Sequence, residues 1–272
     1  MDYRSPPRQL TAYSLKRRLR FLTSRLIGAR LQKSQAMRFV DFEGTRYKRI
    51  ILRDSHLAAT IEHALEAFGS SVHLPPLAVR YEHEIWTEFV PGRALDPSRL
   101  TDIQALAALY SALYSRRSAL HWLEDTPFPY RLWSDLRFLA RVGVISSDQH
   151  EGLVALADKV APVHVWIGFD YTDPVTKNFI IREDTEAACA IDVESLEQGV
   201  LLGWGIAKAK ARWLGANTDE FLSALKTEPA ADLRGYFDYV ELCFLARWTK
   251  MGFLERKWKY VDPKRLTAQL NR

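Results

Sequence analysis

Three short oxygen-bearing side chains are spaced in a way that could do chemistry. Asp173 is followed by four residues and then by Asn178, and the apolar stretch 179–181 comes directly after it. A turn at 182–186 and a second apolar stretch at 188–191 lead to Asp192. A strand hairpin of this length returns Asp192 close to Asn178, so we expect the three side chains to converge at one end of a two-stranded ribbon.

The chemistry that this set allows is phosphoryl transfer. Asn178 and Asp192 offer the hard oxygen ligands that Mg²⁺ prefers, and phosphate oxygens would complete its coordination. Asp173 stays available to orient a substrate hydroxyl and to accept its proton. Asp and Asn are also common in turns, so ordinary turn chemistry remains the alternative explanation of this stretch.

The elements that must position these residues fall into two groups. The N-terminal part predicts a hairpin of strands at 37–42 and 45–53 around Glu43-Gly44, a helix at 55–68 capped by Ser55, and strands at 77–81 and 84–90. Pro91-Gly92 ends the last strand. A capping-box pattern at Thr101–Gln104 then opens a mainly helical part, interrupted by a strand-rich stretch at 163–193. Further long helices are predicted at 200–214 and 232–254.

This organisation predicts an α+β protein with a small N-terminal lobe, made of an antiparallel sheet and one helix, and a larger helical C-terminal lobe. The expected boundaries are 1–35 for a basic N-terminal helix, 36–90 for the small lobe and 91–272 for the large lobe. The segment 88–95 would link the two lobes.

The basic charge is concentrated at the N-terminus. Residues 1–53 contain 14 Lys or Arg against 3 Asp or Glu, although the whole chain has a net charge of only +5. Within 14–33, leucines recur at helical spacing and cations fill much of the remaining surface. This segment could pack on its own domain or lie on an anionic membrane surface. Nucleic-acid binding is the weakest of the three interpretations, because no aromatic interleaving or nucleic-acid motif accompanies the charge.

The composition excludes several classes of protein. Of the 272 residues 47% are hydrophobic, which is ordinary globular usage, and the two cysteines are too few for a disulfide framework or a zinc knuckle. There is no long apolar run and no secretory signal pattern, so we expect a cytoplasmic protein, peripheral at the inner face of the membrane if 14–33 binds there. A G-x-S-x-G nucleophile motif is also absent from the sequence.

The stretch 171–194 resembles the catalytic and metal-binding loops of the protein-kinase-like superfamily. The closest similarity is to the aminoglycoside phosphotransferase and choline kinase group, and kinases of lipopolysaccharide core sugars are similar. That group typically shows His-Gly-Asp, four residues, Asn, a few apolar residues, and later Ile-Asp-Phe/Trp-Glu. This chain has Asp173, Asn178 and then Ile191-Asp192-Val193-Glu194, with 19 residues from Asp173 to Asp192.

The resemblance implies roles for these residues. Asp173 would be the catalytic aspartate, and Asn178 and Asp192 would hold Mg²⁺ against the phosphates of ATP. Tyr171 and Thr172 stand where the group has His and Gly. Asp170 is the alternative catalytic carboxylate if the loop carries an insertion, and the spacing to Asn178 favours Asp173.

A second match lies in the linker. Residues 86–95, WTEFVPGRAL, resemble the group's hinge, which often reads Met-Glu-Tyr-Val-Pro-Gly. The backbone of Glu88, Phe89 and Val90 would then bind the adenine edge. The phosphate-binding cation is open between Lys48 and Arg53. Glu62, 14 residues after Lys48, is its expected ion-pair partner, and Glu66, one helical turn further on, is the alternative partner.

Together these features predict an ATP- and Mg²⁺-dependent phosphotransferase that acts on a hydroxyl of a small molecule or glycan. A lipopolysaccharide core sugar is the favoured acceptor if 14–33 touches a membrane, and a soluble antibiotic or metabolite is its rival. Two alternatives stay open: a pseudokinase that binds nucleotide without phosphotransfer, and the transfer of another group such as AMP.

Overall fold

The computed structural model describes residues 34–69 and 71–271, and these form two compact units. Unit 1 contains the residues up to Asp96 together with Thr176–Leu196, and unit 2 contains Pro97–Val175 and Glu197–Arg272. The helix predicted at 14–33 lies outside the described residues. The α+β class predicted from the sequence is confirmed, with an antiparallel sheet in the N-terminal part and helices dominating the C-terminal part.

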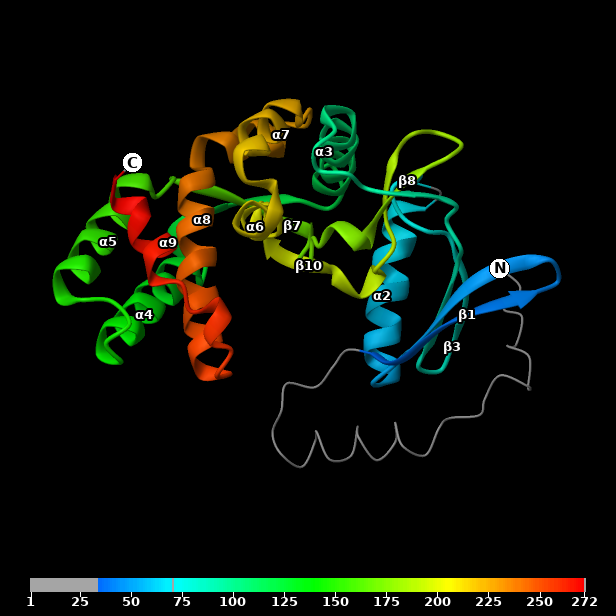
Figure 1. Ribbon diagram of the computed structural model, residues 1–272, viewed down its shortest axis with the longest axis horizontal. Helices are drawn as coiled ribbons and strands as arrows, with labels where there is room; N and C mark the ends of the chain where they lie inside the picture. Colours follow the sequence, from blue (N-terminus) through cyan, green and yellow to red (C-terminus); the bar gives the residue numbers. More distant parts are fainter. Residues whose placement is uncertain (1–33, 70, 272) are drawn as a thin grey trace. The chain divides into compact units, whose positions relative to one another are not determined.

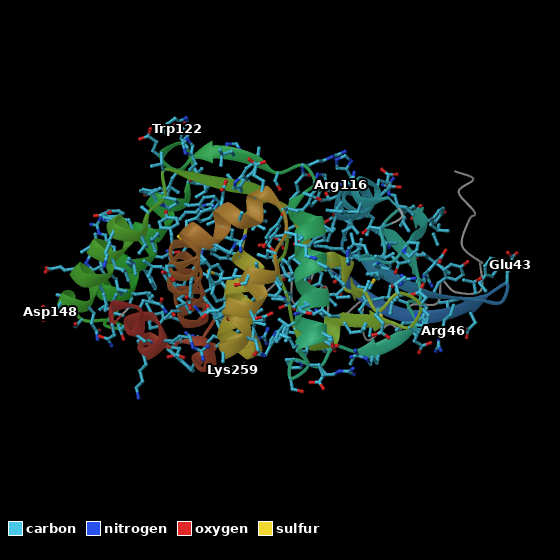
Figure 2. All side chains as sticks on the ribbon, turned by 90° about the horizontal axis from the view of Figure 1, so that it is seen from above. Glu43, Arg46, Arg116, Trp122, Asp148 and Lys259 are labelled. Carbon is cyan, nitrogen blue, oxygen red and sulfur yellow. The ribbon has the colours of Figure 1, made fainter. Side chains whose placement is uncertain are left out.

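The main sheet of unit 1 has the strand order β1-β2-β4-β3 and is antiparallel throughout. Its strands are β1 (Ser34–Phe42), β2 (Thr45–Leu52), β3 (Leu77–Tyr81) and β4 (Glu84–Glu88). The predicted hairpin is confirmed: Glu43 and Gly44 make its turn, both with positive φ, and Figure 2 shows Glu43 at this turn. Side chains from β2 and β4, such as Ile50, Leu52 and Ile85, are buried in the core of the unit.

Helix α2 (Ser55–Phe68) packs against this sheet and supplies the other side of the core (Figure 1). Its buried residues Ile61, Leu65 and Phe68 follow the stripe that the sequence predicts. The cap differs from the prediction. Asp54, not Ser55, is the N-cap, and its carboxylate accepts a hydrogen bond from Leu57 N at 2.8 Å, because the helix begins at Ser55 itself.

A second sheet in unit 1 has the order β5-β8-β9, and two of the predicted site residues lie just outside its strands β8 and β9. It contains β5 (Gly92–Ala94), β8 (Phe179–Arg182) and β9 (Ala188–Ala190). The β8–β9 pair is antiparallel with Phe179 opposite Ala190, as the predicted hairpin requires. Gly92 lies so close to β8 that a Cβ on it would meet the Ile181 carbonyl, so only glycine allows this pairing.

Unit 2 is mainly helical and is organised around its longest helix. The helices are α3 (Leu100–Tyr114), α4 (Phe128–Arg141), α5 (Ser147–Val160), α6 (Trp204–Ala209), α7 (Thr218–Ala224), α8 (Glu228–Leu254) and α9 (Pro263–Thr267). A small sheet of order β10-β7-β6, in which β6 and β7 are antiparallel, is formed by β6 (Ala119–Trp122), β7 (His164–Tyr171) and β10 (Leu196–Leu201). Helix α8 contacts α4, α5 and α6, as Figure 1 shows for α4 and α6. The apolar residues of α8, such as Leu233, Val240 and Leu245, are therefore buried.

Two local predictions in unit 2 are wrong. The capping box at Thr101 does not form, because α3 begins at Leu100 with Arg99 as its N-cap. The helix predicted from 200 begins only at Trp204. Gly203, with a left-handed φ of 90°, separates this helix from strand β10. The last part of the predicted helix is the π-helical segment η5 (Lys210–Leu214).

Candidate functional site

Asp173 follows strand β7 and presents a partly exposed carboxylate. Its Oδ1 lies 2.7 Å from Lys208 Nζ and 3.5 Å from Arg212 Nη1, and its side chain is 43% exposed. Lys208 also donates to the Thr172 carbonyl at 3.0 Å. The Trp213 indole N–H donates to the Pro174 carbonyl at 2.5 Å, so η5 also holds the residue after Asp173. The Asp173 carboxylate is thus held by its contacts and is still open to solvent.

Asp170 is in a different environment, although it is only three residues away. It is fully buried, and its carboxylate accepts hydrogen bonds from Tyr171 N at 2.7 Å and Gly205 N at 3.0 Å. The N–H groups of Gly203 and Trp204 also face it. The carboxyl group of Asp170 therefore ties strand β7 to the start of helix α6, which is a structural role.

Burial dominates the ionisation of Asp170. Removal from water raises the pKa of its carboxyl from 3.8 to about 7, although the backbone N–H donors act in the opposite direction. Gly205 makes this close approach possible, because a Cβ at that position would lie 2.1 Å from the Tyr171 carbonyl oxygen. Tyr110 and Tyr114 hold the backbone next to this carboxyl group. The Tyr110 hydroxyl donates to the Tyr171 carbonyl, and the Tyr114 hydroxyl accepts from Gly203 N.

Asn178 and Asp192 lie at the same end of the β8–β9 ladder in unit 1. Asn178 directly precedes β8, Asp192 follows β9 after one residue, and Ile191 N donates to the Asn178 carbonyl at 2.9 Å. The predicted meeting of these two residues is therefore present in the backbone. The Asn178 side chain is buried, and that of Asp192 is 30% exposed and accepts a hydrogen bond from Ser195 Oγ at 3.0 Å.

This pair of oxygen-bearing side chains fits a Mg²⁺ ion that takes its remaining ligands from phosphates and water, as Mg²⁺ commonly does. Across 34–69 and 71–271, no group of three or more His, Cys, Asp or Glu residues could hold a metal by itself. A metal at this pair would thus depend on a bound phosphate compound for much of its coordination.

The two candidate phosphate-binding cations occupy different places in unit 1. Lys48, on β2, is buried; its Nζ donates to the Ile191 carbonyl at 2.8 Å and lies 3.6 Å from Asp192 Oδ1. Arg53 instead donates to Asp54 at 2.8 Å. Glu62 forms an ion pair with Arg80, on β3, at 3.5 Å. Of the two cations, Lys48 is therefore the one that the structure brings to Asp192.

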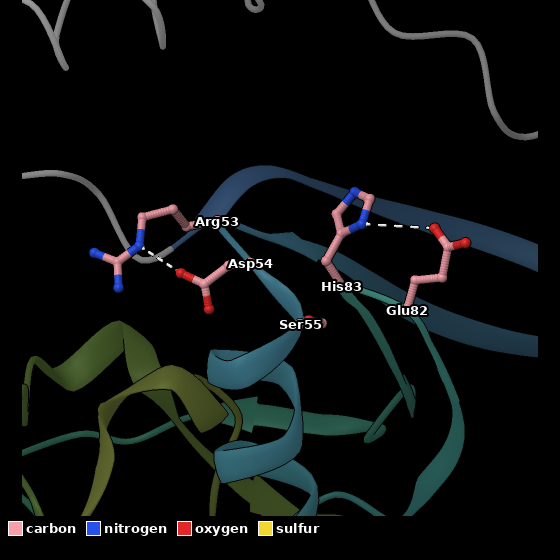
Figure 3. A pocket seen from close by; sticks show the side chains of 5 residues that line it. All are labelled: Arg53, Asp54, Ser55, Glu82 and His83. Atoms are coloured by element: carbon pink, nitrogen blue, oxygen red, sulfur yellow. Dashed lines mark hydrogen bonds and ion pairs between the residues drawn. The ribbon is translucent and has the colours of Figure 1, made fainter.

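Arg53 lines a pocket of about 410 Å³ together with Asp54, Ser55, Glu82 and His83. Figure 3 shows Arg53 directed at Asp54 and His83 directed at Glu82, with Ser55 at the start of α2. Arg53 and His83 thus each have an acidic neighbour from their own stretch of chain.

The predicted hinge residues span the end of β4 and the residues after it. Glu88 N donates to the Pro76 carbonyl at 3.0 Å, and Phe89 N donates to the Arg46 carbonyl at 2.9 Å. The Phe89 ring is 41% exposed, and the Arg46 guanidinium lies 5.3 Å from its centroid; Figure 2 marks Arg46 on the strand that follows the hairpin turn. Val90 is buried.

Sequence reasoning missed the two cations next to Asp173. Lys208 and Arg212 are four residues apart, which places them on one face of a helical segment. That spacing was visible in the sequence, but nothing local connected it to a carboxylate 35 residues earlier. Ser195, which holds Asp192, was also missed, although a hydroxyl three residues after an aspartate is a common local pairing.

The fold of this chain is similar to that of solved ethanolamine and choline kinases and of an aminoglycoside phosphotransferase. Among solved structures, choline kinase LicA from Streptococcus pneumoniae matches with a TM-score of 0.57 at 13% identity, over 95% of this chain and 99% of its own. A choline/ethanolamine kinase family protein from Mesorhizobium loti matches with a TM-score of 0.57 at 15% identity, over 87% and 88%. A macrolide 2′-phosphotransferase type I matches with a TM-score of 0.55 at 11% identity, over 96% and 99%.

These structural neighbours are kinases and phosphotransferases of small molecules. No protein-family model matches this sequence. No curated protein matches it in sequence. In the part of the chain that the structure describes, no helix is both long enough and apolar enough to cross a membrane.

Proposed function

We propose that this protein is an ATP- and Mg²⁺-dependent phosphotransferase that acts on a hydroxyl group of a small molecule or glycan. The observation that carries the proposal is the grouping at the end of the β8–β9 ladder. There Asn178, Asp192 and the buried Lys48 supply an amide oxygen, a carboxylate and an ammonium group, with Lys48 Nζ 3.6 Å from Asp192. The two oxygen-bearing side chains suit a metal ion and the ammonium group suits a phosphate, so the three together suit a phosphate compound with its bound metal ion. One structural neighbour, an aminoglycoside phosphotransferase, was solved with ADP and hygromycin B.

The proposed roles follow from the chemistry of each side chain. Asn178 and Asp192 would hold Mg²⁺, which supplies neutralisation of phosphate charge when it is bound. Lys48 would exchange its contact with Asp192 for one with the ATP phosphates. Asp173 would accept the proton of the acceptor hydroxyl while the hydroxyl oxygen bonds to the γ-phosphorus, and the bond from that phosphorus to the ADP oxygen breaks. Asp173 belongs to unit 2, and Asn178, Asp192 and Lys48 belong to unit 1.

Adenine would bind at the segment 88–90. The N–H groups of Glu88 and Phe89 already donate to backbone carbonyls, so the N–H group that donates to adenine would be that of Val90. The Phe89 and Val90 side chains would then offer apolar contact on either side of the base.

Nucleotide binding is the first test of this function. We expect ATP with Mg²⁺ to raise the melting temperature of the wild type, because a ligand that binds only the folded state stabilises it by mass action. Asp192→Ala should lose the Mg²⁺-dependent part of this shift. Asp184→Ala is the matched control, because Asp184 lies in the turn of the same β8–β9 hairpin and is exposed. Absence of any shift in the wild type with millimolar ATP would overturn the proposal.

A pseudokinase is the second candidate, and one observation favours it. The candidate carboxylates at both places are already paired with lysine, Asp192 with Lys48 and Asp173 with Lys208. A protein that keeps these pairs after binding nucleotide would not turn over. Nucleotide binding without product on any acceptor would favour this candidate, and mass spectrometry of a modified acceptor would separate phosphoryl from adenylyl transfer.

The basic segment 14–33 motivates a finer proposal on location and acceptor. Leucines at helical spacing among many cations suit the surface of an anionic membrane at the cytoplasmic face, where a lipopolysaccharide core sugar would be within reach. Sedimentation with phosphatidylglycerol vesicles should remove the full-length protein from solution, whereas phosphatidylcholine vesicles should not. Equal behaviour with both would favour a soluble acceptor such as an antibiotic or metabolite.

A further inference from the structure

The carboxylate proposed to receive the acceptor is bracketed by two cations from one short segment. Lys208 is in α6 and Arg212 is in η5, one helical turn later. Their terminal nitrogens lie 2.7 Å and 3.5 Å from the same oxygen, Oδ1 of Asp173. One carboxylate thus serves two cations, and this group of three side chains has a net positive charge.

Two other cations of unit 2, one in η5 and one in α9, have acidic partners of their own. Lys210 lies 2.6 Å from Glu241, which is on α8. Arg265 lies 3.7 Å from Asp262. Each of these two cations thus has a carboxylate to itself, whereas Lys208 and Arg212 share the carboxylate of Asp173, which the acceptor hydroxyl would approach.

Both cations are positioned to bind a further group. The side chains of Lys208 and Arg212 are 23% and 32% exposed, so they are fixed by their contacts yet open to solvent. The indole of Trp213 holds the Pro174 carbonyl and so fixes the loop that carries Asp173 relative to η5. A guanidinium beside an ammonium forms strong, charge-assisted hydrogen bonds with phosphate or carboxylate oxygens. A cationic acceptor at the same place would be repelled by both side chains.

We propose that the acceptor of this enzyme carries an anionic group, a phosphate or a carboxylate, close to the hydroxyl that is phosphorylated, and that Arg212 and Lys208 bind that group. A phosphorylated or carboxylated sugar or polyol has this chemistry. The inference rests on the proposed phosphotransferase function and names the substrate class of the same site. Asp173 takes the hydroxyl proton as before, and the two cations set which acceptors place their hydroxyl beside it.

Matched acceptors that differ in one group test this specificity. Glucose, glucose 6-phosphate, glucuronate and glucosamine present a neutral, a phosphorylated, a carboxylated and a cationic form of one ring. With ATP and Mg²⁺ we expect the two anionic sugars to have a kcat/KM about tenfold or more above that of glucose, and glucosamine to be the poorest acceptor. An equal or better kcat/KM for glucosamine would overturn the inference.

Variants identify the residues responsible. Arg212→Gln should raise KM for the anionic sugars about tenfold while changing KM for glucose little, and Lys208→Gln should act in the same direction. Arg234→Gln is the matched control, because Arg234 is an exposed arginine on α8 of the same unit, and it should leave the preference unchanged. If Arg212→Gln and Lys208→Gln instead lower kcat equally for every acceptor, the cations serve the transferred phosphoryl group and the inference is wrong.

A binding measurement keeps this inference separate from the proposed function. The indole N–H signal of Trp213, assigned in an NMR spectrum with Trp213→Phe, should shift on addition of glucose 6-phosphate but not of glucose, and the apparent Kd should rise at least severalfold in Arg212→Gln. A shift of this kind without any thermal response to ATP would overturn the phosphotransferase function and retain the anion site. No response to tens of millimolar glucose 6-phosphate, in a protein that does bind ATP, would overturn the anion site alone.

Discussion

The buried carboxyl group of Asp170 makes the stability of this protein depend on pH in a specific direction. Its pKa is 3.8 in the unfolded chain and about 7 in the folded protein. Between these two values the folded state keeps a proton that the unfolded state has lost, so rising pH favours unfolding. The contribution is zero below 3.8, becomes increasingly unfavourable up to about 7, and is constant at higher pH.

The size of the effect follows from the shift. A difference of about 3 units corresponds to about 4 kcal/mol in the free energy of unfolding, at 1.36 kcal/mol per unit. In the middle of this window the wild type should lose about 1.4 kcal/mol per pH unit through Asp170 alone. Asp170→Asn removes the titrating group and keeps its shape, so this slope should disappear in the variant.

Urea unfolding, monitored by tryptophan fluorescence at a series of pH values, measures how the free energy of unfolding changes with pH. The quantity to compare is the wild-type free energy of unfolding minus that of Asp170→Asn, because other titrating groups cancel in the difference. Asp158→Asn is the matched control: Asp158 is an exposed aspartate in α5, so the same change of charge leaves the buried carboxyl untouched. Parallel curves for wild type and Asp170→Asn would refute the reasoning, because they would mean that the N–H donors of α6 keep the carboxylate ionised.

Further predictions concern packing, buried charge and the candidate site. Gly205→Ala should destabilise the protein by about 3 kcal/mol or more in urea unfolding, because the new Cβ would lie 2.1 Å from the Tyr171 carbonyl oxygen. Gly235→Ala in α8 is the control: a Cβ there meets nothing within 4 Å, so this variant should be neutral or more stable by about 0.5–1 kcal/mol. Asp135→Ala should lower the free energy of unfolding by about 3 kcal/mol, because Arg247 and Lys250, which lie 3.2 Å and 2.7 Å from the buried Asp135 carboxylate, would lose their shared partner. A decrease below about 1 kcal/mol would show that both cations are solvated by water in the variant. Lys48→Met should weaken ATP binding at least tenfold in calorimetric titrations with Mg²⁺, while Arg53→Met should change it little, and the reverse order would assign the phosphates to Arg53.

Local sequence patterns were a good guide where neighbouring residues decide the structure. The hairpin around Glu43-Gly44 and the stripe of α2 formed as predicted, because turn chemistry and periodicity act over a few residues. The same patterns failed where packing overrides them. Thr101 offered a capping box, yet the N-cap of α3 is Arg99, two residues earlier, and the helix buries Asp102 and Ile103.

The segment 200–214 shows a second kind of failure. Its apolar residues fit a helical period, but Leu201 completes a strand that pairs with β7, and Gly203 turns the chain into α6. A short apolar run cannot by itself distinguish a strand from a helix, because the partner strand lies elsewhere in the sequence. The glycine was the local signal that could have placed the break.

The sequence by itself determined the α+β class, the β8–β9 hairpin and the meeting of Asn178 with Asp192, since these depend on residue types and short spacings. Only the tertiary structure separated Asp170 from Asp173, which the sequence offered as alternatives, by burying the first under α6 and leaving the second partly exposed. It also placed Lys48 rather than Arg53 at Asp192, and brought Lys208 and Arg212 to Asp173. Burial and ion pairing arise from chain segments that are distant in sequence, and local periodicity carries no information about which of them will meet.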